Sequence, residues 1–301
     1  MSTMPQLPWG ARVAVIRLRS LGDCVLTTPA LALLREARPD LRVAVVVEPR
    51  FAAVFTGNPA LDEILPPSRA ALRRWAPDLC LNFHGGTRSM WLTLCSGAKL
   101  RAGFDHFPAQ ALYNAAIPAA QVILDVHRTV HTAEHLASAM FWLGVPQTEV
   151  PRARLFPGAP SPLAGHYVVI HPFASAPDKA WPVEKFAALA AALAPHIEPV
   201  FIGAAEDDLS PFRSWRVQQG SDLEEVKSLL AGASLFIGND SGPAHMAAAF
   251  GLPVLVFWGN SDPAIWGPWK TEHVLLNHAR GIAHVDVNRA LEAVEQLRVK
   301  A

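Results

Sequence analysis

Three segments of this sequence carry residues that could hold a phosphate or move a proton. In the first, Asp23 ends the turn Arg19-Ser20-Leu21-Gly22-Asp23, directly after an apolar run. A carboxylate at that point can act as a general base toward a hydroxyl. The alternative is that Asp23 only caps the helix that follows, a common role for Asp that is worth about 1 kcal/mol.

The second segment joins His171-Pro172-Phe173-Ala174-Ser175 to Asp178-Lys179-Ala180-Trp181-Pro182. Here Lys179 lies in the loop before an expected helix, and Ser175 lies just upstream of it. A cation and a hydroxyl at a strand-to-helix junction could hold phosphate oxygens. The alternative is an ordinary solvated loop lysine.

The third segment, Gly238-Asn239-Asp240-Ser241-Gly242-Pro243-Ala244-His245, is the most specific. It follows an apolar run and opens an expected helix. The N–H groups of Ser241 and Gly242 at that helix start would suit a diphosphate, because a helix N-terminus carries partial positive charge. Asp240 would repel a phosphate, so we expect it to hold sugar hydroxyls. The alternative is a plain Asp or Ser cap with Gly-Pro turn chemistry.

Two further patterns bear on cofactors. Glu206 follows an apolar run and could accept hydrogen bonds from ribose hydroxyls, or it could simply belong to the solvated acidic run Glu206-Asp207-Asp208. The twelve histidines form no HxxH or HExxH pattern, and we therefore expect no metal site. A GxGxxG fingerprint is also missing after the first strand, which disfavours a nicotinamide-dependent oxidoreductase.

The elements that must position these residues alternate between short apolar runs and helical patterns. We expect strands at residues 12–18, 41–47, 78–83, 166–171, 198–202, 234–237 and 254–258. Helices are expected at residues 24–37, 87–95, 131–143, 183–193, 223–231 and 243–250, with a final one after Asp286. This alternation predicts parallel sheets built from βαβ units. In such sheets, ligands bind outside the carboxyl ends of the strands.

Residues 144–165 contain five prolines and show no period, which is typical of a connecting segment. We therefore predict two α/β domains, residues 1–160 and 161–301, with a ligand cleft between them. The length of 301 residues agrees with two domains.

Composition narrows the class of protein. Hydrophobic residues make up 51% of the chain and charged residues 17%, so a packed core is expected rather than disorder. The net charge of zero disfavours a general nucleic-acid binder. Residues 1–160 nevertheless carry 16 Lys/Arg against 11 Asp/Glu, and residues 161–301 carry 10 against 15. The three cysteines predict no disulfide framework, and the absence of a signal-like or bilayer-length apolar run predicts a cytoplasmic protein.

Taken together, these segments resemble glycosyltransferase family 9, the ADP-heptose:lipopolysaccharide heptosyltransferases. The resemblance is carried by residues 13–40, 45–65, 168–190 and 229–268, which follow one another in the family's order. It implies an α/β fold of the GT-B type, with two Rossmann-like parallel-sheet domains facing across a cleft. The N-terminal domain would bind the acceptor and the C-terminal domain the nucleotide sugar, with the terminal helix free to pack back on the N-terminal domain.

The resemblance also implies roles for single residues. Asp23 matches the catalytic base, Asp240 the contact to the donor sugar and Glu206 the contact to the nucleoside. The donor diphosphate would be held by a group of five residues: Ser175, Lys179, Ser241, Gly242 and His245. The sequence departs from the family's pattern at Phe173, at Asn260-Ser261 and at His84.

The implied activity is inverting, metal-independent transfer of a heptose from ADP-heptose to a lipopolysaccharide core acceptor, with no cofactor. The basic N-terminal half suits an anionic glycolipid or oligosaccharide, for which the candidate contacts are Arg17, Arg19, Arg88 and Arg101. The resemblance is also compatible with peripheral contact at the cytoplasmic face of the inner membrane, and a nucleic-acid partner is not expected. The alternatives are a GT-B transferase that uses another nucleotide sugar for a surface polysaccharide, and a non-catalytic nucleotide-sugar-binding protein.

Overall fold

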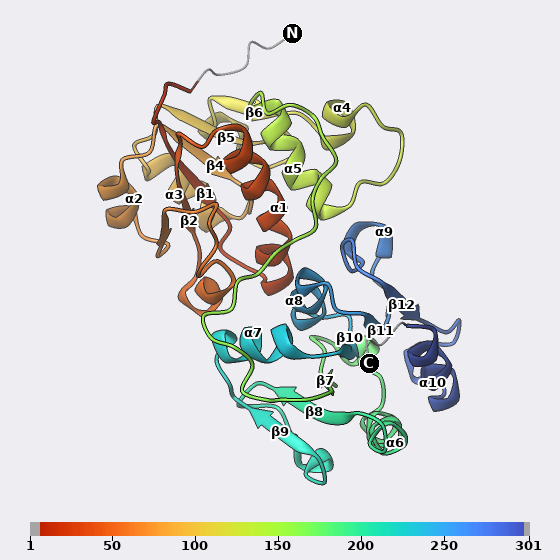
Figure 1. Ribbon diagram of the computed structural model, residues 1–301. Helices are drawn as coiled ribbons and strands as arrows, with labels where there is room; N and C mark the ends of the chain where they lie inside the picture. The colour runs from red at the N-terminus through yellow and green to blue at the C-terminus, as the bar shows by residue number, and fades with distance from the viewer. Residues whose placement is uncertain (1–6, 298–301) are drawn as a thin grey trace. The chain divides into compact units, whose positions relative to one another are not determined.

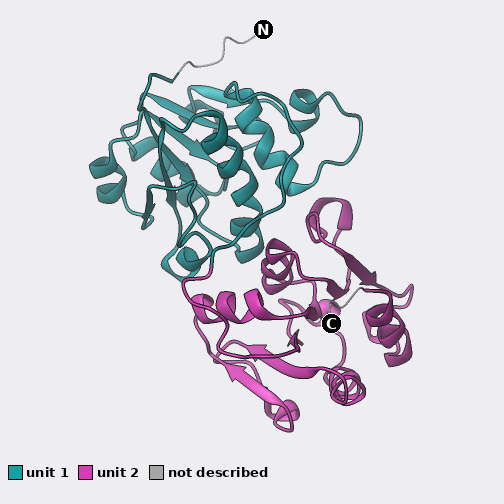
Figure 2. Ribbon diagram, in the orientation of Figure 1, with its two compact units in different colours: residues 1–156 teal, residues 157–301 magenta. Residues whose placement is uncertain are grey.

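The computed structural model describes residues 7–297, and the chain divides into two compact units, residues 1–156 and 157–301 (Figure 2). Each unit contains one six-stranded parallel sheet. The expected α/β class and the parallel sheets are confirmed.

The sheet of the first unit has the strand order β3-β2-β1-β4-β5-β6 (Figure 1). Its strands are β1 (Arg12–Ile16), β2 (Arg42–Val46), β3 (Glu63–Leu65), β4 (Leu79–Asn82), β5 (Leu100–Phe104) and β6 (Ala115–Ile117). The central strands β1 and β2 consist of buried Val, Ile and Ala after a leading Arg, and all four residues of β4, Leu79, Cys80, Leu81 and Asn82, are buried. Such runs form strands that are covered on both faces.

Helices connect these strands. They are α1 (Leu21–Ala37), α2 (Arg69–Trp75), α3 (Thr87–Cys95), α4 (Ala120–Leu124) and α5 (Thr132–Trp142), with short 3₁₀ turns η1 (Pro49–Val54) and η2 (Gln110–Leu112). Helix α1 packs along α5, and α2 packs beside α3.

The sheet of the second unit has the order β12-β11-β10-β7-β8-β9. Its strands are β7 (Tyr167–His171), β8 (Glu198–Gly203), β9 (Arg216–Gln219), β10 (Leu235–Asn239), β11 (Val254–Phe257) and β12 (His273–Leu276). The helices are α6 (Val183–Leu193), α7 (Leu223–Gly232), α8 (Gly242–Phe250), α9 (Pro263–Trp266) and α10 (Val287–Gln296), with 3₁₀ turns η3 (Pro177–Lys179), η4 (Ser210–Phe212) and η5 (Ile282–His284).

The two sheets share one topology. Counted from β7, the second sheet runs 3-2-1-4-5-6, which is the order of the first sheet and of dinucleotide-binding Rossmann folds. In both units successive strands are added first on one side of the first strand and then on the other. The switch points lie between β1 and β4 and between β7 and β10. The loops that leave these strands are the expected place for a site.

The last helix, α10, packs against α6 in the second unit. Its Ala290, Ala293 and Val294 belong to the same buried core as Phe186 and Phe257. None of the helices in residues 7–297 combines the length and the apolar character that crossing a membrane requires.

Candidate functional site

Asp23 lies at the carboxyl end of β1, in the first turn of α1. Its Oδ2 accepts hydrogen bonds from the backbone N–H of Ser20 at 3.2 Å and from the Ser20 hydroxyl at 3.0 Å. The N-cap of α1 is therefore Ser20, and Asp23 is the third helical residue. The alternative that Asp23 is itself the N-cap is wrong, because α1 begins at Leu21, three residues before the expected start at residue 24. The Asp23 side chain keeps a fifth of its surface exposed.

A buried arginine stands beside this carboxylate. Arg17 Nη1 is 3.7 Å from Asp23 Oδ1, and the Arg17 side chain is 8% exposed. Burial lowers the pKa of the Arg17 guanidinium, while the charge of Asp23 opposes that shift. The Arg17 Nε has no hydrogen-bond partner within the described chain. A desolvated cation with a donor to spare is thus fixed next to Asp23.

His84 completes this side of the first unit, at the carboxyl end of the neighbouring strand β4. Its Nδ1 lies 3.2 Å from the carbonyl oxygen of Arg19. Burial, and then the charge of Arg17, lower the pKa of His84. The imidazole therefore favours its neutral form, in which one ring nitrogen can accept a hydrogen bond.

The four arginines expected to contact an acceptor differ in position. Arg17 and Arg19 lie in the strand-to-helix connection that leads to Asp23, and Arg88 reaches Glu48 Oε1 at 3.4 Å, beyond the end of β2. Arg101 lies near the amino end of β5 and donates to the carbonyl oxygens of Leu112 (3.1 Å) and Ala98 (3.3 Å). The structure therefore places three of the four arginines at the same edge of the sheet as Asp23, and Arg101 away from that edge.

In the second unit, Lys179, Asp240 and Ser261 form a connected group. Lys179 Nζ donates to Ser261 Oγ at 2.7 Å and lies 3.4 Å from Asp240 Oδ2, and the Ser261 hydroxyl donates to the same Oδ2 at 2.7 Å. These residues come from the loops after β7, β10 and β11, which are neighbours in the sheet. Three segments far apart in the sequence therefore meet at one sheet edge.

The start of α8 lies beside this group. Ser241 is its N-cap, but the Ser241 side chain makes no capping bond and instead lies 3.2 Å from His171 Nδ1. Burial lowers the pKa of His171 to about 4, so this imidazole is neutral near pH 7. Gly242 is the first residue of α8, and His245 is buried one turn further on. A nine-residue helix thus opens toward the same edge.

Ser175 and Glu206 are more peripheral. Both are exposed, and neither hydroxyl nor carboxylate has a hydrogen-bond partner among the residues described. Glu206 follows β8, whose carboxyl end adjoins that of β7. The two residues therefore lie at the same edge as Lys179, without touching the connected group.

A buried amide fixes the loop that carries Lys179. Asn239, at the end of β10, accepts from the Trp181 backbone N–H at 3.0 Å and donates to the Pro172 carbonyl oxygen at 2.9 Å. The Trp181 indole stacks on Phe257 at 3.8 Å between ring centroids and donates to the Val285 carbonyl oxygen at 2.9 Å. Both ends of the loop are therefore held against the sheet.

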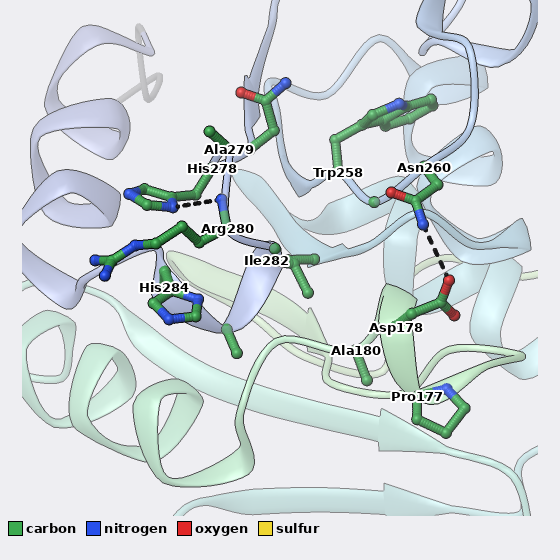
Figure 3. A pocket seen from close by; sticks show the side chains of 14 residues that line it. Pro177, Asp178, Ala180, Trp258, Asn260, His278, Ala279, Arg280, Ile282 and His284 are labelled. Carbon is green, nitrogen blue, oxygen red and sulfur yellow. Dashed lines mark hydrogen bonds between the residues drawn. The ribbon is translucent and has the colours of Figure 1, made fainter.

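A cavity of about 600 Å³ is lined by chain neighbours of the connected group, among them Asp178, Ala180 and Asn260 (Figure 3). Its walls come from the segment 177–180, the segment 258–260 after β11 and the segment 277–284 after β12. Asn260 and Asp178 face each other on one side, where Asn260 Nδ2 donates to Asp178 Oδ2 at 3.2 Å. On the other side the rings of His278 and His284 stack at 5.5 Å.

Sequence reasoning missed Ser261, His171 and Asn239 as parts of this site. The departure from the family's pattern at Asn260-Ser261 is the signal that could have pointed to Ser261. No comparable signal marks Asn239, because a buried amide inside an apolar strand shows its partners only in three dimensions. Within residues 7–297 there is no cluster of three or more His, Cys, Asp or Glu side chains suited to a metal ion.

The chain matches a protein family over three quarters of its length and a curated relative over nearly all of it. The model of glycosyltransferase family 9 (heptosyltransferase) matches residues 68–292. Lipopolysaccharide heptosyltransferase 1 of Escherichia coli K12 is 26% identical over 330 residues, which cover 95% of this chain and all of that protein.

Solved structures show the same fold. A family 9 glycosyltransferase from Veillonella parvula superposes with a TM-score of 0.83 at 22% identity, over 97% of this chain and 98% of that one. The E. coli heptosyltransferase WaaC with ADP-2-deoxy-2-fluoro heptose superposes with a TM-score of 0.78 at 21% identity, over 95% of this chain and 99% of that one.

Proposed function

Because this chain belongs to glycosyltransferase family 9 and has its GT-B fold, we propose that it transfers a heptose from ADP-heptose to a lipopolysaccharide core acceptor. Curated relatives that align with nearly the whole chain are lipopolysaccharide heptosyltransferases, and WaaC has been solved with an ADP-linked fluoroheptose. The observation that carries the proposal is the joining of Lys179, Ser261 and Asp240 beside the open start of α8.

On this proposal the second unit holds the donor. Lys179 and the N–H groups at Ser241 and Gly242 face the diphosphate, where a cation and a helix N-terminus both favour negative charge. Asp240 accepts hydrogen bonds from hydroxyls of the sugar. Ser175 and His245 are further diphosphate contacts, and Glu206 holds the ribose. Donor binding rests on these local groups, since residues 161–301 carry a net charge of −5.

The first unit supplies the base and the acceptor contacts. Asp23 takes the proton of an acceptor hydroxyl, whose oxygen attacks the anomeric carbon while the bond to the ADP phosphate breaks. The anomeric configuration is inverted, because a single displacement occurs and no covalent enzyme intermediate forms. Lys179 and the start of α8 stabilise the charge that develops on the leaving diphosphate, so the proposed step requires no metal ion.

Arg17, Arg19 and Arg88 are the proposed contacts to the anionic acceptor. Arg101 is left out of this set, because backbone carbonyl oxygens already occupy its guanidinium. We also propose a cytoplasmic location, with contact at the inner face of the membrane, since donor and acceptor would meet there.

The direct test is turnover by the purified protein. ADP-heptose with a lipopolysaccharide core acceptor should release ADP, whereas other ADP- and UDP-linked sugars should react more slowly. Faster release from another nucleotide sugar would replace heptose as the donor. Donor binding without turnover on any acceptor would indicate a binding protein instead.

Asp23→Asn tests the base. We expect kcat to fall by about 10²–10⁴-fold with little change in donor affinity, because the amide cannot take a proton. The side-chain oxygen of Asn can still accept from Ser20, so the start of α1 should persist, and the melting temperature checks this. Asp40→Asn, at a carboxylate that pairs with Arg38 at the opposite end of the unit, is the matched control. Full turnover by Asp23→Asn would remove Asp23 as the base.

A further inference from the structure

The surface of α2 and α3 in the first unit combines exposed apolar side chains with a concentration of cations. Trp91 is 61% exposed and Leu94 is 37% exposed, both on α3. Arg88 precedes Trp91 by three residues, so all three share one side of the helix. We call this surface the α2–α3 face and define it by Arg69, Arg73, Arg74, Arg88, Trp91 and Leu94.

The basic side of α2 continues into this apolar stripe. Arg73 Nε donates to the carbonyl oxygen of Cys95, at the end of α3, at 3.1 Å. Arg69 and Arg74 are exposed, and neither is in an ion pair with any described residue. Their charges are therefore available to an external anion.

The four arginines of this face belong to a stretch that holds the charge excess of the N-terminal half, and the other two cations of that stretch, Lys99 and Arg101, lie outside the face. Residues 66–101 carry six Lys/Arg and a single acidic residue, Asp78, which gives +5. That equals the excess of the whole range 1–160, so the rest of that range is balanced. One stretch of 36 residues thus accounts for the positive charge of the half.

We propose that the α2–α3 face docks the protein on an anionic lipid bilayer. Each Lys or Arg near an anionic membrane surface strengthens binding about fivefold. Trp favours the interface between headgroups and acyl chains, where its apolar ring and polar N–H are both accommodated. The face supplies both contributions to binding at a membrane surface, which scales with the buried apolar area plus the electrostatic attraction to anionic lipids.

The position of the face relative to Asp23 deepens the proposed function by naming the surface that receives the acceptor. Helix α3 begins three residues after His84, whose ring contacts the loop that leads to Asp23. Arg88 belongs both to the face and to the proposed acceptor contacts. An acceptor with a lipid anchor in the bilayer would therefore present its sugar close to the base. Only this last step rests on the proposed function.

Vesicle sedimentation with the full chain tests the docking. Binding to vesicles that contain phosphatidylglycerol should exceed binding to pure phosphatidylcholine by at least about tenfold, and it should fall as NaCl rises from about 0.05 to 0.5 M. Arg69→Glu with Arg74→Glu should reduce the partition coefficient at least about tenfold. Trp91→Ala should lower it by a smaller factor that persists at high salt, since the apolar contribution is not screened.

Matched control variants test whether the loss of vesicle binding is specific to the α2–α3 face. Trp9→Ala removes another exposed tryptophan, 86% exposed, and Arg213→Glu reverses an exposed charge on the second unit. Both should bind vesicles like the wild type. Arg69→Lys with Arg74→Lys should also retain binding.

Three outcomes would overturn the proposal: equal binding to both kinds of vesicle, unchanged binding by the α2–α3 face variants, or a dimer that forms through this face in place of lipid binding. The assay is independent of turnover. If the wild-type protein does not bind anionic vesicles but transfers normally to a lipid-free acceptor fragment, the docking is rejected and the proposed function stands. Vesicle binding without transfer to any acceptor would support the docking and reject the proposed function.

Discussion

Ser261 links the cation and the carboxylate of the donor side, at a position that departs from the family's pattern. Its hydroxyl accepts from Lys179 and donates to Asp240. We predict that Ser261→Ala raises the donor KM about tenfold, because a hydrogen bond to a charged group contributes roughly 1.5–3 kcal/mol. Isothermal calorimetry with ADP and steady-state kinetics would measure this. Ser261→Thr keeps the hydroxyl and should restore most of the affinity, and equal effects of the two substitutions would refute this role.

His171 makes stability depend on pH. Burial lowers its pKa to about 4 in the folded protein, against roughly 6.5 in an unfolded chain. The unfolded chain therefore binds the proton first, and the stability contributed by neutral His171 is present above pH 6.5 and lost progressively as the pH falls toward 4. Urea unfolding of the second unit should show this loss, up to about 3 kcal/mol.

His171→Asn should flatten that acid slope, because an amide does not titrate in this range and can still bond to Ser241. His196→Asn, at an exposed turn of the same unit, should keep the slope of the wild type. An identical slope in His171→Asn would assign the acid sensitivity to other groups.

At the scale of elements, the loop between β7 and α6 is held in place by a side chain from β10. Asn239 satisfies the N–H of Trp181 and the carbonyl oxygen of Pro172. Asn239→Ala would leave both buried groups unpaired, at about 1–3 kcal/mol each in unfolding free energy. Because this loop carries Lys179, we expect the donor KM to rise as well, with kcat changed less. Asn239→Asp keeps one acceptor and should restore part of the stability. An unchanged KM would show that Lys179 is positioned without Asn239.

The capping residue of α7 gives a second prediction at this scale. Asp222 accepts from the Glu225 N–H at 2.9 Å, and Glu225 reaches back to the Asp222 N–H. Asp222→Ala should lower the unfolding free energy by about 1 kcal/mol, without a change in turnover. Asp222→Ser restores a capping oxygen and should recover the loss. Chemical denaturation measures both, and a loss below a few tenths of a kcal/mol would contradict the cap.

The predicted elements agree with the structure where the sequence pattern is strongest. The buried strands β1, β2, β7 and β11 and the amphipathic helices α6 and α7 lie within one or two residues of their expected bounds. The strands that were not predicted are β3, β5, β6, β9 and β12. Four of these are edge strands, and β5 contains an arginine and a glycine, so none presents a long apolar run.

The same distinction holds for the site. Lys179 and Asp240 could be singled out because each follows a strand that the pattern reveals. Their contact through Ser261, and the loop contacts of Asn239, depend on which strands become neighbours. Sequence spacing does not contain that information, since β7, β10 and β11 are separated by helices and by more than eighty residues in all.

At the scale of the whole molecule, charge separates the proposed tasks. The first unit carries the excess of cations, and the acceptor is expected to be polyanionic. We predict that kcat/KM for this acceptor falls steeply as salt rises, because screening weakens long-range attraction. The variant with Arg19→Gln and Arg88→Gln should show a shallower dependence in the same assay. An equal dependence would mean that these arginines do not attract the acceptor.

The repeated strand order 3-2-1-4-5-6 has a consequence for the history of the chain. In both units the proposed functional groups follow the same two strands: Asp23 and His84 follow β1 and β4, while Lys179 and Asp240 follow β7 and β10. A gene duplication, in which one ancestral half was copied and fused to itself, would produce this correspondence. On the proposed function, each copy would then have diverged at the same sheet edge, one toward proton transfer and one toward phosphate recognition.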